Sequence, residues 1–146
     1  MGNKKLLNNA GTHYFMGMIE FSNLKCTLPE EKQNDYSFAV NKDNVLQHVL
    51  VRTRSETDKS TKNDWFPFDV PAKFDWLALI CKFKNGELSS WIIPIDIAIK
   101  YATPAENDVT TPQIKHLSLA RLEIAELAAF KNNWSLNRPT INPIDD

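Results

Sequence analysis

Apolar side chains recur at helical spacing near the start of the chain, and they follow a strand-like pattern further on. Over residues 10–23 the apolar positions lie about three or four residues apart, which predicts the first helix. Residues 34–40 and 45–54 then predict the two strands of a hairpin, joined by a polar turn at residues 41–44. The chain is therefore predicted to begin with a helix and a β-hairpin.

The second half of the chain is predicted to hold two more strands and a long helix. Residues 74–83 are almost continuously apolar, as expected for a strand that is covered on both faces, and residues 88–93 predict the next strand. The two prolines within residues 65–71 exclude a central strand there. A short helical turn follows at residues 95–101, and spaced leucines predict a helix over residues 112–131.

This order of elements predicts an α/β (α+β) fold, with a mixed central sheet of about four to five strands flanked by helices. The length of 146 residues fits a single domain with an adequate core. We expect residues 1–9 to be an N-terminal extension, residues 10–131 to form the domain, and residues 132–146 to be a loose, polar tail.

Composition and charge place the chain among ordinary globular proteins. Hydrophobic residues make up 42% and charged residues 24%, which argues against disorder. The net charge of −1 argues against avid, purely electrostatic binding of duplex nucleic acid, although a local basic patch is compatible with it. The two cysteines lack metal-type spacing, and no apolar run has the length of a signal peptide core or a membrane span. We expect a reduced, cytoplasmic protein with no membrane contact.

The predicted hairpin brings a carboxylate and a guanidinium group together. With the turn placed as above, Val40 pairs with Val45, and counting back along both strands puts Asp35 opposite Leu50. Arg52 lies two residues beyond Leu50 and therefore points to the same face of the hairpin. The sequence thus predicts an aspartate and a guanidinium group on one side of this sheet.

Alternation along the second strand of the hairpin separates polar from apolar side chains. One face carries His48, Leu50, Arg52 and Arg54. The other face carries Val45, Val49, Val51 and Thr53. A solvated strand end and a phosphate-contacting patch both account for this asymmetry. No carboxylate is placed by the sequence to orient His48, so a catalytic triad is not predicted.

Five short motifs follow one another along roughly residues 10–100. They are Gly11-Thr-His-Tyr-Phe, Asn34-Asp35, Leu50-Val51-Arg52-Thr53, Phe74-Asp75-Trp-Leu-Ala-Leu and Trp91-Ile-Ile-Pro94. Their order and spacing resemble the PD-(D/E)XK nuclease superfamily, in particular its restriction-endonuclease-like and resolvase-like members. The resemblance implies a restriction-endonuclease-like fold that cuts phosphodiesters with Mg²⁺, which takes oxygen ligands from an acid on one strand and a Glu or Gln on the next.

The chain departs from that pattern at two of its three chemical positions. Asp35 matches the first metal ligand, but Leu50 cannot coordinate a metal, and Arg52 keeps the charge of the family's lysine without being able to act as a base. The resemblance therefore implies that Asp35 and Arg52 line a degenerate centre, with Mg²⁺ as cofactor only if catalysis survives. If an acidic ligand has moved to a neighbouring element, the candidates are Glu20, Glu56 and Asp58.

Further basic residues extend the candidate surface. We expect His48 and Arg54 to contact nucleic acid, together with Lys59 and Lys62 of the following loop, whose aromatic residues either stack on bases or fold back onto the core.

Three functions stay open on the sequence. The first is a PD-(D/E)XK nuclease-like domain that binds nucleic acid, or a partner that processes it, with impaired catalysis. The second is an active Mg²⁺-dependent endonuclease with a relocated acidic ligand. The third is a protein-interaction module of the inhibitor or immunity type. A homodimer is also left open.

Overall fold

The computed structural model describes residues 2–27, 38–56, 66–70, 73–104 and 113–138. In chain order the elements are α1 (Gly2–Phe21), β1 (Lys25–Thr27), β2 (Phe38–Lys42), β3 (Val45–Ser55), β4 (Phe66–Val70), β5 (Trp76–Lys82), β6 (Leu88–Pro94), α2 (Ile95–Tyr101), β7 (Thr103–Pro104), β8 (Gln113–Leu117), α3 (Leu119–Leu122) and α4 (Ala125–Ala128). None of the helices in these ranges is both long enough and apolar enough to span a membrane.

The strands form two sheets. The main sheet has five strands in the order β1-β2-β3-β5-β6, in which β3 and β5 run parallel and the other neighbours antiparallel. The second sheet has three strands in the order β4-β8-β7. The predicted α+β fold with a mixed central sheet flanked by helices is confirmed. The small second sheet was not predicted.

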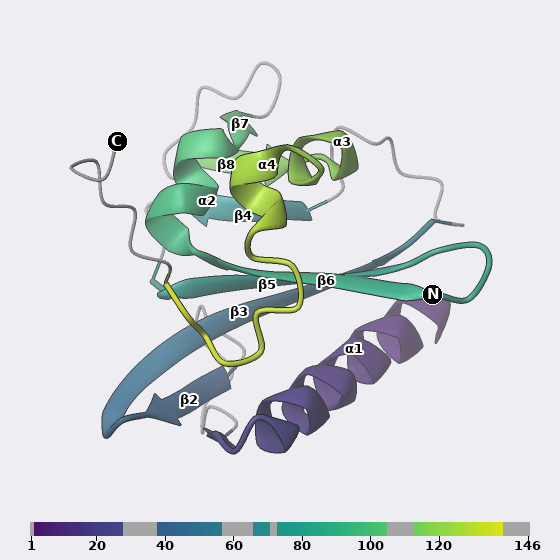
Figure 1. Cartoon of the computed structure of the whole chain (residues 1–146). Helices are drawn as coiled ribbons and strands as arrows, with labels where there is room; N and C mark the ends of the chain where they lie inside the picture. Colours follow the sequence, from purple (N-terminus) through teal and green to yellow (C-terminus); the bar gives the residue numbers. More distant parts are fainter. Residues whose placement is uncertain (1, 28–37, 57–65, 71–72, 105–112, 139–146) are drawn as a thin grey trace.

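Each face of the main sheet has its own hydrophobic core. Helix α1 covers one face, where Phe15 and Ile19 pack with Val49. The second sheet, α2, α3 and α4 cover the other face, where Phe66 and Leu122 pack with Leu50. Figure 1 shows α1 below the sheet and the other elements above it. Because both faces are covered, β5 is buried along almost its whole length, as its apolar run predicted.

The hairpin between β2 and β3 turns in two residues. Asp43 and Asn44 both have positive φ angles, 53° and 65°, and Lys42 pairs with Val45. A two-residue hairpin turn requires this backbone conformation, which Asp and Asn tolerate better than most residues. The predicted pairing of Val40 with Val45 is therefore wrong, since Val40 pairs with Gln47.

The corrected register leaves the predicted faces of β3 unchanged. It differs from the predicted one by two residues, and side chains alternate with a period of two. Leu50 accordingly packs in the core beneath α2–α4, and Val49 packs in the core beneath α1. The predicted partner of Leu50, Asp35, lies outside the described residues.

Helix α1 begins at Gly2, well before the predicted start at residue 10. It also passes directly over β3, because a Cβ atom added at Gly11 would meet the side chain of Thr53. Gly11 thus allows the close approach of helix and strand.

The predicted helix over residues 112–131 is wrong. Residues 113–117 form β8, which pairs with β4, and only two short helices, α3 and α4, follow. Ser118 does cap a helix, as its position suggested, because its hydroxyl accepts a hydrogen bond from the Arg121 amide at 3.2 Å. Tertiary pairing with β4 therefore overrides the helical spacing of the leucines in this stretch.

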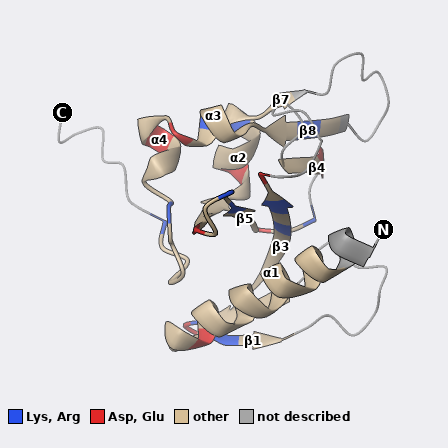
Figure 2. Cartoon of the chain, turned by 90° about the vertical axis from the view of Figure 1, so that its right-hand side faces the viewer, with Lys and Arg blue, Asp and Glu red and all other residues tan. Residues whose placement is uncertain are grey.

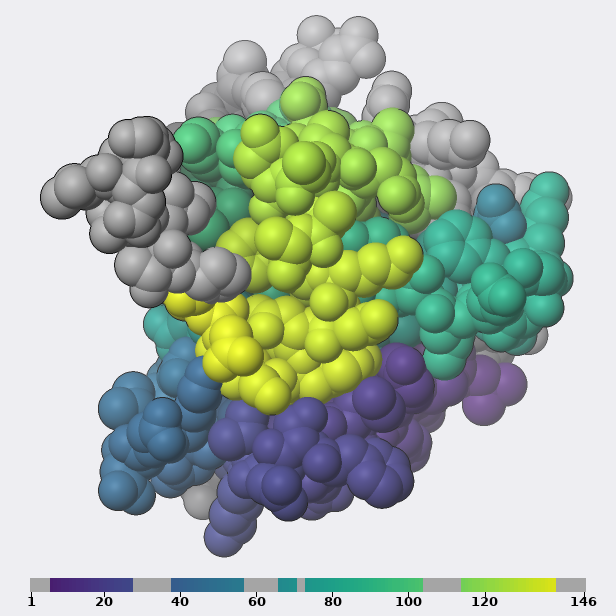
Figure 3. Space-filling model, in the orientation of Figure 1, coloured from purple at the N-terminus to yellow at the C-terminus, as the bar shows by residue number. Residues whose placement is uncertain are grey.

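The tail is not loose where the structure describes it. Trp134 and Leu136 are buried in the core beneath α1, and the Trp134 ring packs edge-on against Tyr14 with centroids 5.5 Å apart. In Figure 3 this C-terminal segment (yellow) crosses the face of the molecule between α1 and the α3–α4 region. The predicted loose tail is wrong for residues 132–138, because two large apolar side chains anchor it.

Candidate functional site

The C-terminal half of β3 carries two arginines on the face that turns toward the second sheet. Arg52 and Arg54 share this face with Leu50, as alternation predicted. Figure 2 shows this basic stretch at the end of β3 that points toward β4. The structure thus brings the two predicted arginines together on one surface.

Arg52 contacts β4 through its guanidinium group. Its Nε donates a hydrogen bond to the carbonyl oxygen of Pro67 at 3.2 Å. Arg52 as a whole is exposed, but partial burial of the guanidinium lowers its pKa; Asp69 opposes this shift, and Arg54 adds to it. Because an arginine pKa starts so high, the group stays charged and can bind an anion without serving as a base.

Leu50 is part of the hydrophobic core rather than of a polar site. Only 8% of its surface is exposed, and it pairs with Leu77 in the neighbouring strand β5. A carboxylate at this position would be buried among apolar side chains, which carries a large desolvation cost. The aliphatic residue therefore fits its surroundings, and it offers no oxygen to a metal.

Two candidate metal ligands do not join Arg52. Glu20 lies at the end of α1, on the opposite face of the sheet from Leu50. Its carboxylate is close enough to the Cys26 thiol to affect it electrostatically. Glu56 stays at the end of β3, where its Oε1 accepts a hydrogen bond from the amide of Lys84 at 2.8 Å. The carboxylate of Glu56 thus holds the turn between β5 and β6.

Magnesium has no ligand set in the part of the chain that the structure describes. No group of three His, Cys, Asp or Glu side chains converges there. Mg²⁺ binding in proteins relies on carboxylate oxygens, usually more than one. The described residues therefore do not fit a Mg²⁺ site. The predicted ligand Asp35, the further candidate Asp58 and the predicted contacts Lys59 and Lys62 lie outside them.

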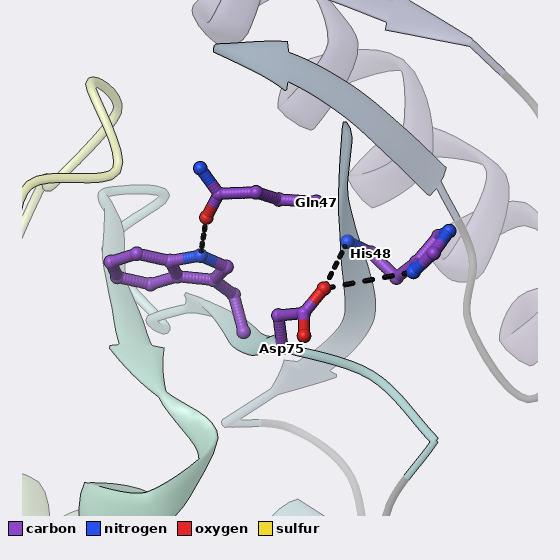
Figure 4. Close-up of polar contacts among 4 residues, drawn as sticks. Gln47, His48 and Asp75 are labelled. Atoms are coloured by element: carbon purple, nitrogen blue, oxygen red, sulfur yellow. Dashed lines mark hydrogen bonds and ion pairs between the residues drawn. The ribbon is translucent and has the colours of Figure 1, made fainter. Parts of the chain in front are cut away.

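His48 has an acidic partner that the sequence did not reveal. Its backbone amide donates a hydrogen bond to the Asp75 carboxylate at 2.8 Å, and its Nδ1 lies 3.6 Å from the same oxygen (Figure 4). The expectation that no carboxylate orients His48 is therefore wrong. The parallel pairing of β3 with β5 creates this contact, and no local pattern in the sequence announces it.

His48 and Arg52 are separate parts of the same face. They lie four residues apart on one strand, which corresponds to about 13 Å. His48 is tied to Asp75 at the start of β5, whereas Arg52 is tied to Pro67 of β4. The two contacts therefore do not form one catalytic cluster.

An open groove of about 580 Å³ lies at the end of the sheet near the hairpin turn. Gln47 and Trp76 stand in its wall, joined by a hydrogen bond from the indole nitrogen to the carboxamide oxygen (Figure 4). Its cationic groups are already engaged: Lys42 donates to the carbonyl of Leu136 at 2.8 Å, and Arg138 pairs with Asp96. Of the two cations, Arg138 is neutralised by its carboxylate partner, and the ammonium of Lys42 is held by neutral oxygens of the C-terminal segment.

Asp69 is the charged residue near Arg52 that sequence reasoning missed. It lies on β4, two residues after Pro67, and it is exposed. The stretch Phe66-Pro-Phe-Asp-Val70 does alternate between apolar and less apolar positions, which is a strand signal. The prolines masked that signal, although β4 is an edge strand of its sheet, where a proline is tolerated.

Comparison with known proteins supports a nuclease-like fold. The chain is similar to a bacterial homing endonuclease, I-Ssp6803I, with a TM-score of 0.59 and 16% sequence identity over 93% of this chain and 91% of that one. No protein-family model and no curated protein sequence matches the chain. At this identity the likeness establishes the fold alone. Membership of the PD-(D/E)XK superfamily stays a prediction.

Proposed function

We propose that this chain is a nuclease-like domain that binds nucleic acid through the basic face of β3, defined by Arg52 and Arg54, and that has lost efficient phosphodiester cleavage. The nuclease-like fold, shared with a protein described as a homing endonuclease, supports nucleic acid as the ligand. The observation that carries the second half of the proposal is the burial of Leu50 next to the arginines, on the same face of β3.

The guanidinium of Arg52 suits a phosphate oxygen. Its Nε is hydrogen-bonded to Pro67, and among the described residues no hydrogen bond of its terminal amino groups is found. A planar guanidinium can hold two phosphate oxygens at once, and its hydrogen bonds to a charged acceptor are stronger than neutral ones. The partial burial of the group strengthens such a contact, since less water competes for it.

The same residues argue against efficient catalysis. Phosphodiester cleavage of the Mg²⁺-dependent kind needs oxygen ligands for the metal and a group that positions the attacking water. Leu50 supplies no oxygen, and Arg52 cannot accept a proton. The proposed activity is therefore binding without a metal-dependent step.

A binding and cleavage assay with one labelled duplex and its separated strands tests this proposal. We expect salt-sensitive binding by the wild type, a loss of at least about tenfold in the Arg52→Gln/Arg54→Gln variant, and a smaller salt slope, because each arginine releases about one counterion. The matched control is Lys25→Gln/Arg121→Gln, which removes the same charge from exposed positions on β1 and α3. We expect the control to keep near-normal affinity.

Three outcomes would overturn the proposal. Equal binding by both double variants would mean that nucleic acid, if bound, does not use this face. Cleavage in Mg²⁺ or Mn²⁺ that is abolished by Asp35→Ala would instead favour an active endonuclease. Absence of any binding would leave a protein-interaction module.

A further inference from the structure

Strand β4 presents one edge of its backbone to β3. Within the described residues it pairs with β8 on one side only, with Phe66 and Phe68 turned into the core. Pro67 and Asp69 alternate with these aromatics and are not buried. The carbonyl of Pro67 accepts the hydrogen bond from Arg52, so the edge of β4 that faces away from β8 lies against the basic face of β3.

This arrangement brings a negative charge close to the candidate phosphate site. Asp69 and Pro67 are two residues apart on the same strand, so their Cα atoms are about 7 Å apart and their side chains point the same way. The attraction between Asp69 and Arg52 raises the pKa of the guanidinium, in opposition to the effect of its burial. Among the described residues, Asp69 is thus a counter-charge for Arg52.

We propose that Asp69 competes with nucleic acid for Arg52 and thereby sets the affinity of the basic face for phosphate. This inference rests on the function proposed above. A phosphate that approaches Arg52 gains the attraction of the guanidinium but also meets the repulsion of the Asp69 carboxylate. The result is a site that binds the phosphate backbone of a nucleic acid only weakly. Weak backbone binding fits a chain whose net charge is −1.

Asp69→Asn tests this inference, since it removes the charge and keeps the shape. We expect the variant to bind the labelled duplex about fivefold more tightly than the wild type at low salt, as removal of one nearby unit charge implies. The gain is expected to shrink at high salt, because screening weakens exposed charges. Asp69→Ser, which lacks the amide, is expected to give a similar gain.

The matched control is Asp43→Asn. It makes the same chemical change at an exposed position in the hairpin turn, where φ is 53° and Asn is well tolerated. Asp43 is nine residues from Arg52 along the chain, at the far end of β3. We expect Asp43→Asn to bind like the wild type, since the gain comes from the site and not from the change in net charge.

A double-variant cycle shows whether the effect passes through Arg52. In the Arg52→Gln background, Asp69→Asn is expected to give no gain. Equal affinities of Asp69→Asn and Asp43→Asn would overturn this inference, as would a fivefold gain that persists without Arg52. If the wild type binds and loses binding with Arg52→Gln/Arg54→Gln while Asp69→Asn has no effect, only the role of Asp69 fails. If the arginine variants have no effect, the proposed function fails and the role of Asp69 fails with it.

Discussion

His48 and Asp75 are joined by two hydrogen bonds immediately before the parallel ladder between β3 and β5 begins. The His48 amide donates to the Asp75 carboxylate at 2.8 Å, and the Asp75 amide donates to the His48 carbonyl at 2.8 Å. The ladder between β3 and β5 begins at the next pair, Val49 with Trp76. Asp75 therefore closes the end of the parallel ladder with its side chain as well as its backbone.

Asp75→Ala is expected to destabilise the fold by about 1 kcal/mol. A hydrogen bond to a charged group contributes more than a neutral one, but the Asp75 side chain is 55% exposed, so water replaces part of the loss. Asp75→Asn keeps an acceptor oxygen and is expected to lose less. Urea unfolding at neutral pH checks both values, and an unchanged midpoint for Asp75→Ala would contradict the role given to this contact.

Gly11→Ala and Gly17→Ala make a matched pair on α1. A Cβ atom at Gly11 would come within 1.8 Å of the Thr53 hydroxyl oxygen, whereas at Gly17 no atom lies within 4 Å. We expect Gly11→Ala to destabilise the protein by about 2 kcal/mol or more, because the helix must move off β3. Gly17→Ala is expected to stabilise it by roughly 0.5–1 kcal/mol through helix propensity.

A second substitution separates this clash from other effects. Thr53→Ala removes the hydroxyl and methyl groups that the added Cβ atom at Gly11 would meet. The Cβ atom of residue 53 remains, 2.8 Å from the added Cβ, so Thr53→Ala should rescue Gly11→Ala only in part. Thermal unfolding of five proteins gives the comparison: the wild type, Gly11→Ala, Thr53→Ala, the Gly11→Ala/Thr53→Ala double variant and Gly17→Ala. Equal stability of Gly11→Ala and Gly17→Ala would show that α1 does not pack this closely on β3.

The ion pair between Asp96 and Arg138 predicts a small effect at acid pH. The hydrogen bond from Arg138 lowers the pKa of Asp96 below its ordinary value of 3.8. A carboxylate with a depressed pKa stabilises the folded state above the unfolded value, and this contribution is lost as the pH falls through the folded value. Arg138→Gln is therefore expected to cost at most about 0.5 kcal/mol at neutral pH, since both side chains are more than half exposed.

The difference between wild type and Arg138→Gln should vanish when the pH falls below the folded pKa of Asp96. Urea unfolding at neutral pH and in strong acid measures it. If the stability difference between the two proteins persists unchanged in acid, Arg138 stabilises the C-terminal segment by packing instead.

Cys26 is expected to be unreactive in the folded protein. Burial raises the pKa of its thiol from 9.0 to about 12, and the charge of Glu20 adds to the shift. Its stabilising contribution is therefore complete below 9.0 and is lost as the pH rises toward 12. With Ellman's reagent near pH 8, the native protein should react slowly and the urea-unfolded protein quickly. Fast labelling of the native Cys26, followed in a Cys81→Ala variant, would contradict the burial.

The parts of the fold that the sequence predicts well are those whose patterns are local. The strand over residues 45–54 and the apolar strand at residues 74–83 were both placed correctly, as was the short helix at residues 95–101. Whether each segment is a strand or a helix follows from the spacing of apolar residues within that segment alone. The nuclease-like fold likewise followed from motif order and spacing.

The parts that the sequence does not predict depend on contacts between distant segments. β8 lies in a stretch whose apolar positions continue at helical spacing beyond Leu117, and it becomes a strand by pairing with β4. Asp75 reaches His48 through the pairing of β3 with β5. Asp69 comes near Arg52 because β4 packs against β3. The hairpin register was missed for a different reason, because the turn at Asp43 and Asn44 is shorter than the polar stretch around it.

An NMR titration of the arginine side chains shows whether nucleic acid contacts the basic face of β3. The Nε–Hε signals of Arg52 and Arg54, assigned with the single Gln variants, are followed as a short duplex is added at low salt. We expect these two signals to shift with the fraction of protein bound, while the signal of Arg121 on α3 stays in place. Binding that shifts Arg121 and leaves Arg52 and Arg54 unmoved would contradict it.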